Sequence, residues 1–343
     1  YLTKLFYNPS AQYDAARQVK QDLEAARAVI ANYIGARSSE VIFTAGGTEA
    51  NNLVIKGVME QYPDANMIAS SVEHDSVLHP ASEFNAKLLL VAADGRINLN
   101  RLKDLIDDKT ALISVQYANN EIGTVQPIKE IGQLVADVKK ARLSAGNTLP
   151  LIFHTDACQA SGYLDLHASR LGVDAMTINA SKIYGPKQTG ALFIKAGTKI
   201  HPQILGGGQE KGYRSGTENV ANIIGFAKAL SLVQADRHNE AARLSKLREL
   251  FIELLESTIP QVVVNGSRKH RLANNVHITI PGQDNERLMM ELDNRGIICA
   301  VGSACSASND EPSHVLTAIG LSDEDAQASL RFTMGNMTTE AQI

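Results

Sequence analysis

The chain has 343 residues, 44% of them hydrophobic and 20% charged, which is the composition of a globular protein long enough for about two domains. Its net charge of −4 and isoelectric point near 6.2 give no electrostatic basis for direct binding to nucleic acid or to an anionic membrane. No apolar run approaches the ~18 residues of a membrane span, and the first residues carry no signal-peptide core, so we expect no membrane association.

Helical and strand patterns alternate over the first two thirds of the chain. Apolar residues at helical spacing predict helices at 11–34, 50–59, 98–107 and 128–140. Short apolar runs predict strands at 41–44, 66–70, 88–91, 111–115, 151–155, 173–178 and 190–194. This alternation favours an α/β fold in which a mostly parallel sheet is covered by helices on both faces.

A glycine turn joins the first predicted strand to the helix that follows it. The turn reads Ala45-Gly46-Gly47-Thr48-Glu49. Free N–H groups and the helix dipole point at such a turn, and its glycines allow a phosphate to approach the backbone. Gly47 and Thr48 are therefore candidate phosphate ligands, although a plain helix cap has the same pattern.

Polar residues follow four of the predicted strands. They are His74, Asn120, Asp156 and Lys182. Ligands of parallel sheets bind at the carboxyl ends of the strands, so four polar residues at that edge indicate a site. A single His or Asp at such a position is more often a structural loop residue.

Lys182 stands between two runs that we expect to be buried strands. Desolvation near an interior lowers the pKa of a lysine and makes its amine available as a nucleophile, as Schiff-base enzymes require. The alternative is an ordinary lysine in a solvent-exposed turn.

A glycine-rich run at 205–217 predicts a long mobile loop. Arg214 and Thr217 within it suit a second contact to a phosphate or carboxylate, whereas a flexible linker is the simpler alternative.

The last third of the chain changes character after a long predicted helix at 221–257. Strands are predicted at 262–264, 275–280, 297–299 and 330–334, with a helix at 285–295. We therefore expect a large domain at 11–235 and a smaller α+β domain at 236–343, with residues 1–10 near the site.

The three cysteines are too few and too widely spaced for a disulfide framework, and they fit a reducing cytoplasm. Cys305 lies among Ser, Ala and Asn residues, where a thiol is accessible and can react, whereas Cys299 is typical of a core position and Cys158 is ambiguous. Neither CxxC nor HExxH occurs, so we expect no metal site.

Several motifs together resemble the cysteine desulfurases, pyridoxal 5'-phosphate (PLP) enzymes of the class V aminotransferase family. They are Gly46-Gly47-Thr48-Glu49, Glu73-His74, Asn119-Asn120-Glu121-Ile122-Gly123, Asp156-x-x-Gln159, Ser181-Lys182, Arg214-Ser215-Gly216-Thr217 and Gly302-Ser303-Ala304-Cys305. The length of the Cys305 loop is similar to that of the iron–sulfur-cluster assembly branch. The resemblance implies PLP-dependent transferase fold type I, with a seven-stranded large domain and a smaller C-terminal domain.

The resemblance also implies a role for each residue around the ring of PLP. Lys182 is expected to hold the cofactor covalently, and Asp156 to face its ring nitrogen. His74 is expected to stack on the ring and relay protons, while Gln159 and Asn120 contact the ring oxygen.

The phosphate of PLP is expected to lie against Gly47, Thr48 and Ser181, with Thr217 reaching the phosphate of the partner subunit in a homodimer. This sequence reads Asn179-Ala180-Ser181 where the family usually has histidine before the lysine, so Asn179 and Ser181 are expected to supply the missing donor.

The implied substrate is L-cysteine, whose carboxylate Arg331 and Asn8 are expected to bind. Cys305 is expected to attack the substrate sulfur, giving alanine and a persulfide. The sulfur then passes to an acceptor protein, either an iron–sulfur scaffold or a tRNA-thiolation relay.

Two other functions stay open. A selenocysteine lyase or another class V aminotransferase needs no thiol at Cys305, and a catalytically silent sulfur-relay scaffold needs no bound PLP. A nicotinamide-binding Rossmann protein is disfavoured because no G-x-G-x-x-G follows an early strand.

Overall fold

The structure is a computed structural model, and it describes residues 1–302 and 312–343. The helices are α1 (Asp14–Tyr33), α2 (Gly47–Gln61), α3 (Asp75–Ser82), α4 (Leu99–Leu105), α5 (Ile128–Ser144), α6 (Ala168–Leu171), α7 (Val220–Thr258), α8 (Asn285–Asp293), α9 (His314–Ala318) and α10 (Asp323–Gln327). The strands are β1 (Val41–Thr44), β2 (Asn66–Ser70), β3 (Ala86–Leu89), β4 (Thr110–Ser114), β5 (Ile152–Asp156), β6 (Ala175–Asn179), β7 (Gly190–Ile194), β8 (Val263–Val264), β9 (Asn275–Thr279) and β10 (Ser329–Thr333). Short 3-10 helices occur at η1 (Ser38–Glu40), η2 (Ala180–Lys182), η3 (Glu210–Gly212) and η4 (Glu340–Gln342).

Seven strands form the large sheet in the order β1-β7-β6-β5-β4-β2-β3. The strands from β2 to β6 pair in parallel, and only β7 runs antiparallel to its neighbours β1 and β6. The predicted α/β fold with a mostly parallel seven-stranded sheet is therefore confirmed.

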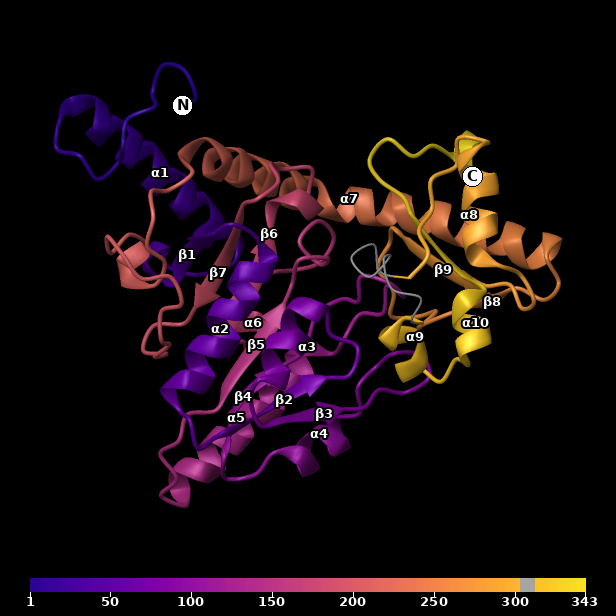
Figure 1. Cartoon of the computed structure of the whole chain (residues 1–343), viewed down its shortest axis with the longest axis horizontal. Helices are drawn as coiled ribbons and strands as arrows, with labels where there is room; N and C mark the ends of the chain where they lie inside the picture. The colour runs from indigo at the N-terminus through magenta and orange to yellow at the C-terminus, as the bar shows by residue number, and fades with distance from the viewer. Residues whose placement is uncertain (303–311) are drawn as a thin grey trace.

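Helices cover both faces of this sheet (Figure 1). On one face, α2 and α3 pack on side chains such as Ile42 and Met67. On the other face, α1, α4, α5 and the first half of α7 pack on side chains such as Phe43, Ile68 and Phe153. Neighbouring residues Ile42 and Phe43 thus enter different cores, as the two-residue period of a strand requires.

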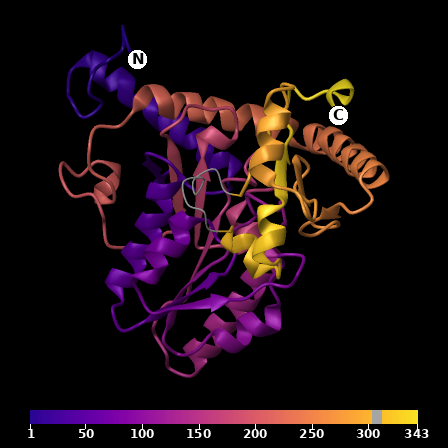
Figure 2. The same cartoon turned by 45° about the vertical axis from the view of Figure 1, so that its right-hand side comes forward.

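The small domain is built on an antiparallel sheet in the order β10-β9-β8. The helix α7, which is 39 residues long, joins this sheet to the large one (Figures 1 and 2). Phe226 and Leu230 of α7 belong to the core of the large sheet, whereas Leu244 and Ile252 belong to the core of the small one. This change of partner along α7 supports, as a proposal, a division of the chain near residue 235.

The C-terminal segment does not pack only within the small domain. Val315 and Leu316 of α9 and Ala326 of α10 are buried in the apolar core of the large sheet. A division of the chain at residue 235 assigns α9 and α10 to the small domain alone. Both helices are too short to show a helical period, so the sequence does not predict their contact with the large sheet.

Several predicted elements differ from the structure. Residues 297–299 form no strand, and Ala300 makes only a single antiparallel bridge to Arg331. The helices α3, α6, α9 and α10, which have four to eight residues, were not predicted. In the described parts of the chain, no helix has both the length and the apolar character that crossing a bilayer needs.

Stability in weak acid depends on His154, which is fully buried in β5. Its Nδ1 lies 2.9 Å from Ser114 Oγ and its Nε2 lies 3.1 Å from Thr177 Oγ1. Burial lowers the pKa of His154 from 6.5 to about 4. The unfolded chain takes up this proton first, so the folded state loses up to about 3 kcal/mol as the pH falls from 6.5 to 4.

We therefore expect His154→Gln to lose less of its free energy of unfolding than the wild type between pH 7 and pH 4.5. Urea unfolding at the two pH values measures this difference. Equal losses in both proteins would show that His154 does not contribute to the acid sensitivity.

Candidate active site

A cavity of about 520 Å³ lies at the carboxyl ends of the parallel strands. The predicted site residues that line it are Gly47, Thr48, His74, Asn120, Asp156, Gln159, Asn179, Ser181, Lys182 and Arg331. They come from α2, from the ends of β5 and β6, from loops and from β10. The sheet topology thus gathers residues that lie far apart in the sequence.

The small domain supplies one wall of this cavity. Arg331 on β10 donates from Nη1 to the backbone oxygen of Asn120, at 2.8 Å. Asn120 follows β4 of the large sheet, so this bond joins the two domains at the cavity. The cavity therefore offers a guanidinium to an anion at the domain boundary.

The amino-terminal end of α2 faces the same cavity. Gly46 adopts a φ of +151°, and α2 begins at Gly47, so the first N–H groups of α2 have no carbonyl partner within the helix. A Cβ added at Gly47 would lie 2.9 Å from Cys158 Sγ, so a larger residue would fill the turn.

Asn179 turns its amide nitrogen toward this end of α2. Its Oδ1 accepts hydrogen bonds from the backbone N–H and the hydroxyl of Ser181, at 3.0 and 3.1 Å. Its Nδ2 therefore lies on the side of Gly47, 3.5 Å from where a Cβ of that glycine would be. We call Gly47, Thr48, Asn179 and Ser181 the phosphate cradle, because these donors and the helix terminus fit a phosphate.

Asp156 is held by two donors at the end of β5. Its Oδ1 accepts the backbone N–H of Cys158 at 2.9 Å, and its Oδ2 accepts Asn51 Nδ2 at 2.7 Å. The two donors fix the orientation of the carboxyl group. A fixed carboxylate is what a protonated pyridine nitrogen needs as a partner.

Burial raises the pKa of two other titratable groups near Asp156. Burial, and then the charge of Asp156, raises the pKa of the Cys158 thiol well above its usual range. Burial also raises the pKa of Glu73 well above its usual range, although its Oε1 accepts the N–H of Gln116 at 2.7 Å. Cys158 is therefore a protonated wall of the cavity at neutral pH, which removes the ambiguity left by its sequence position.

Lys182 lies in η2, directly after β6. Its side chain is exposed, so protein burial does not desolvate the amine, and the expectation of a desolvated lysine is corrected. Lys182 also lines a second cavity of about 390 Å³, together with Tyr163 and Tyr184.

Two predicted site residues, Asn8 and Thr217, do not line the cavity of the single chain, and a third lies outside the residues that the structure describes. Asn8 is in an exposed turn of the N-terminal segment, which lies at the end of the molecule away from the small domain (Figures 1 and 2). Thr217 is exposed on the loop after η3. Cys305 lies outside the described residues.

The site also contains polar residues that sequence reasoning missed. Asn51, Ser76 and Asn274 are buried at or beside the cavity. Asn51 follows Gly47 by four residues, so the helical period could have placed both on one face of α2. No sequence signal identifies Asn274, because β9 reaches the cavity only through the packing of the two domains.

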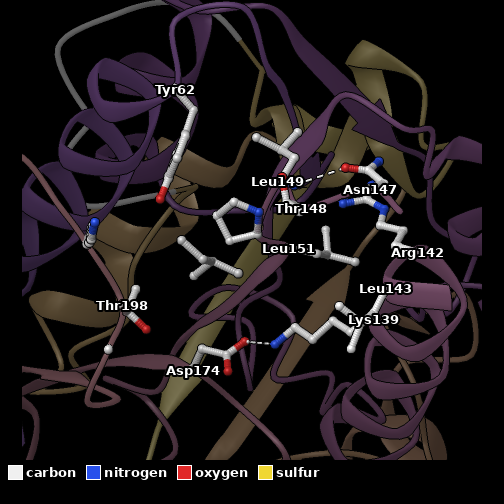
Figure 3. A pocket seen from close by; sticks show the side chains of 14 residues that line it. Tyr62, Lys139, Arg142, Leu143, Asn147, Thr148, Leu149, Leu151, Asp174 and Thr198 are labelled. Carbon is white, nitrogen blue, oxygen red and sulfur yellow. Dashed lines mark hydrogen bonds and ion pairs between the residues drawn. The ribbon is translucent and has the colours of Figure 1, made fainter. Parts of the chain in front are cut away.

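A further cavity, of about 420 Å³, lies at the opposite ends of the parallel strands, near the start of β5 (Figure 3). Three of its charged groups are already paired: Lys139 Nζ lies 2.5 Å from Asp174 Oδ2, and Arg142 Nη1 donates to the backbone oxygen of Thr110 at 2.8 Å. These pairs hold the fold together and leave little chemistry for a ligand. No three His, Cys, Asp or Glu side chains of residues 1–302 and 312–343 are placed to hold a metal ion.

This sheet, with a lysine, an aspartate and a phosphate cradle at the carboxyl ends of its strands, has the architecture of the PLP-dependent transferases of fold type I. The model of the class V aminotransferase family matches residues 1–343, and the chain belongs to that family.

The named relatives narrow the comparison. The chain is 42% identical over 350 residues to cysteine desulfurase IscS of Dictyoglomus turgidum, covering 100% of this chain and 86% of the relative. It is 40% identical over 350 residues to cysteine desulfurase IscS of Methanosarcina thermophila, covering 100% of this chain and 84% of the relative. A NifS-like protein of Rickettsia africae superimposes with a TM-score of 0.86 at 32% identity, over 98% of this chain and 88% of that structure. The resemblance found in the sequence is therefore confirmed.

Proposed function

We propose that the protein is a PLP-dependent cysteine desulfurase that converts L-cysteine to L-alanine and transfers the sulfur to Cys305. The observation that carries this proposal is the cavity that brings Lys182, Asp156, His74 and Arg331 together. The named desulfurases that share about two fifths of its residues support the choice of substrate.

The residues of the cavity fit PLP. Lys182 would hold it covalently, the carboxylate of Asp156 would face its ring nitrogen, and the phosphate cradle would bind its phosphate. When bound, PLP supplies an electron sink for the chemistry at the substrate carbon atoms. Gln159 and Asn120, which line the same cavity, would contact the ring oxygen.

The other residues position the substrate. Arg331, oriented by its bond to Asn120, would bind the carboxylate of L-cysteine, and His74 would hold or move a proton beside it. Asn8 and Thr217 do not line the cavity of one chain. In a homodimer, which we propose, Thr217 would reach the phosphate of the other site; Asn8 stays a proposed contact to the substrate carboxylate.

The sulfur step balances without a further reactant. The Cys305 thiolate attacks the sulfur of the substrate, an S–S bond forms, the C–S bond of the substrate breaks, and its carbon takes up a proton. The products are alanine and a Cys305 persulfide, which then passes its sulfur to an acceptor such as an iron–sulfur scaffold or a tRNA-thiolation relay. Free thiols at Cys158 and Cys299 support a cytoplasmic location.

The test is to load the purified protein with PLP, record its visible absorbance, and add L-cysteine with a reductant. We expect a visible band and the release of alanine and sulfide in equal amounts. Absence of PLP binding would favour the silent scaffold. Turnover of selenocysteine without turnover of cysteine would favour a selenocysteine lyase.

A further inference from the structure

Two buried residues outside the predicted site connect Asp156 to His74. Asn51 on α2 is fully buried, and its Nδ2 lies 2.7 Å from Asp156 Oδ2 and 2.9 Å from Ser76 Oγ. Ser76 Oγ in turn lies 2.8 Å from His74 Nδ1. Asp156, Asn51, Ser76 and His74 therefore form one continuous chain of hydrogen bonds beside the cavity.

The carboxylate of Asp156 determines how the amide of Asn51 points. An ionised carboxylate only accepts hydrogen bonds, so the NH₂ group of Asn51 must face it. The second hydrogen of that group then points at Ser76 Oγ. Asn51 Oδ1 is left buried without a hydrogen-bond partner among the described residues. An orphaned amide oxygen is costly, so the two bonds made by Nδ2 are what hold the side chain in this orientation.

The orientation of the Asn51 amide fixes the Ser76 hydroxyl, and that hydroxyl determines the hydrogen bond made to His74. Because the hydroxyl of Ser76 accepts from Asn51, its own hydrogen is available to donate to His74 Nδ1. The backbone N–H of Ser76 also donates to His74 Nδ1, at 3.0 Å, since His74 is the N-cap of α3. A ring nitrogen that accepts from two donors carries no proton. The N–H of the imidazole is therefore at Nε2.

We propose that Asn51 is a positioning residue that couples Asp156 to His74 and, through Ser76, holds His74 as the Nε2–H tautomer. This inference rests on the proposed function only in taking Asp156 as the partner of the PLP ring nitrogen. In this tautomer the ring nitrogen of His74 that is not bonded to Ser76 is a hydrogen-bond donor. His74 therefore begins the reaction by donating to an acceptor in the cavity, and it accepts a proton only after its bond with Ser76 changes.

The tautomer is tested on the protein without PLP. In a sample labelled with ¹⁵N-histidine, we expect the His74 signals of the Nε2–H form alone, assigned by their loss in His74→Gln. Signals of the Nδ1–H form in the wild-type protein would overturn the proposal. Because no cofactor is needed, the result does not depend on whether the proposed function is correct.

The coupling is tested by the affinity for PLP of Asn51→Leu, Ser76→Ala and the double variant. Asn51→Leu removes a hydrogen bond to a charged acceptor and Ser76→Ala cuts the chain, so we expect each to weaken binding about tenfold. Because both residues act through one chain of hydrogen bonds, the double variant should bind PLP almost as tightly as the single variant with the lower affinity. Ser76→Thr, which keeps the hydroxyl, should restore wild-type affinity. Losses that multiply in the double variant would overturn the coupling while leaving the proposed function intact.

A matched control is Asn66→Leu at the other end of the sheet. Asn66 is also buried and also donates to a carboxylate, with Nδ2 2.9 Å from Asp107 Oδ1. We expect Asn66→Leu to lower thermal stability as Asn51→Leu does but to leave the affinity for PLP unchanged. Equal losses of affinity in both variants would mean that Asn51 acts only through the fold, and the proposal would fail.

Discussion

Lys182→Ala is expected to abolish covalent attachment of PLP and, with it, the visible absorbance of the protein. Lys182 is the lysine that lines the cavity with Asp156, the phosphate cradle and His74. Its amine would both carry the cofactor and move protons at the substrate, so alanine production should fall at least ~10³-fold, within the range by which positioned acid–base groups contribute. Absorbance spectra and an alanine assay measure the two effects.

Lys187→Ala is the control for this variant. Lys187 follows in the same loop and is exposed, but it does not line the cavity. We expect it to keep both the absorbance and the activity. An unchanged absorbance in Lys182→Ala would contradict the assignment of the attachment site, even if activity were lost.

Cys305→Ser is expected to separate cofactor chemistry from sulfur transfer. Because none of the cradle residues changes, PLP should bind as in the wild type. A hydroxyl is a poor nucleophile toward the substrate sulfur, so release of sulfide from L-cysteine should fall at least ~10³-fold, a modest value for the loss of a catalytic nucleophile. An absorbance spectrum and a sulfide assay together measure the outcome.

Cys299→Ser provides the comparison, because Cys299 is half-buried and packs against the core of the small domain. It should release sulfide at close to the wild-type rate. If Cys305→Ser also did so, the nucleophile would be elsewhere. A Cys305→Ser protein that turned over selenocysteine normally and cysteine not at all would instead support a selenocysteine lyase.

The sheet and its ligand edge could be predicted because both depend on local patterns. The strands β1, β2 and β7 have the predicted bounds, since short buried runs with an apolar centre leave little freedom. The topology of parallel strands then places Asp156 and Lys182 at one edge. Neither step requires knowledge of side-chain contacts.

The finer features of the site depend on packing and could not be predicted in this way. The bonds of Asn51 to Asp156 and Ser76 join residues 105 and 25 positions apart, and no spacing rule connects them. Of the two environments that the sequence left open for Lys182, the exposed one is found, because two buried strands beside a loop do not determine whether the loop is covered. The strand expected at 297–299 does not form, because pairing with β10 in this segment is limited to the single bridge between Ala300 and Arg331.

The uninterrupted helix α7 gives the two domains a mechanical connection. With 39 residues it is about 58 Å long, and each of its halves is embedded in a different core. It can therefore act as a lever: a bend of about 5° at its centre displaces either end by about 2.5 Å, and such a bend lies within the gentle curvature of long helices. Arg331 lies in the sheet that packs against one half of α7, and Lys182 follows a strand of the sheet that packs against the other half. A bend in α7 would therefore change the distance between Arg331, which we propose binds the substrate carboxylate, and Lys182, which we propose holds the cofactor.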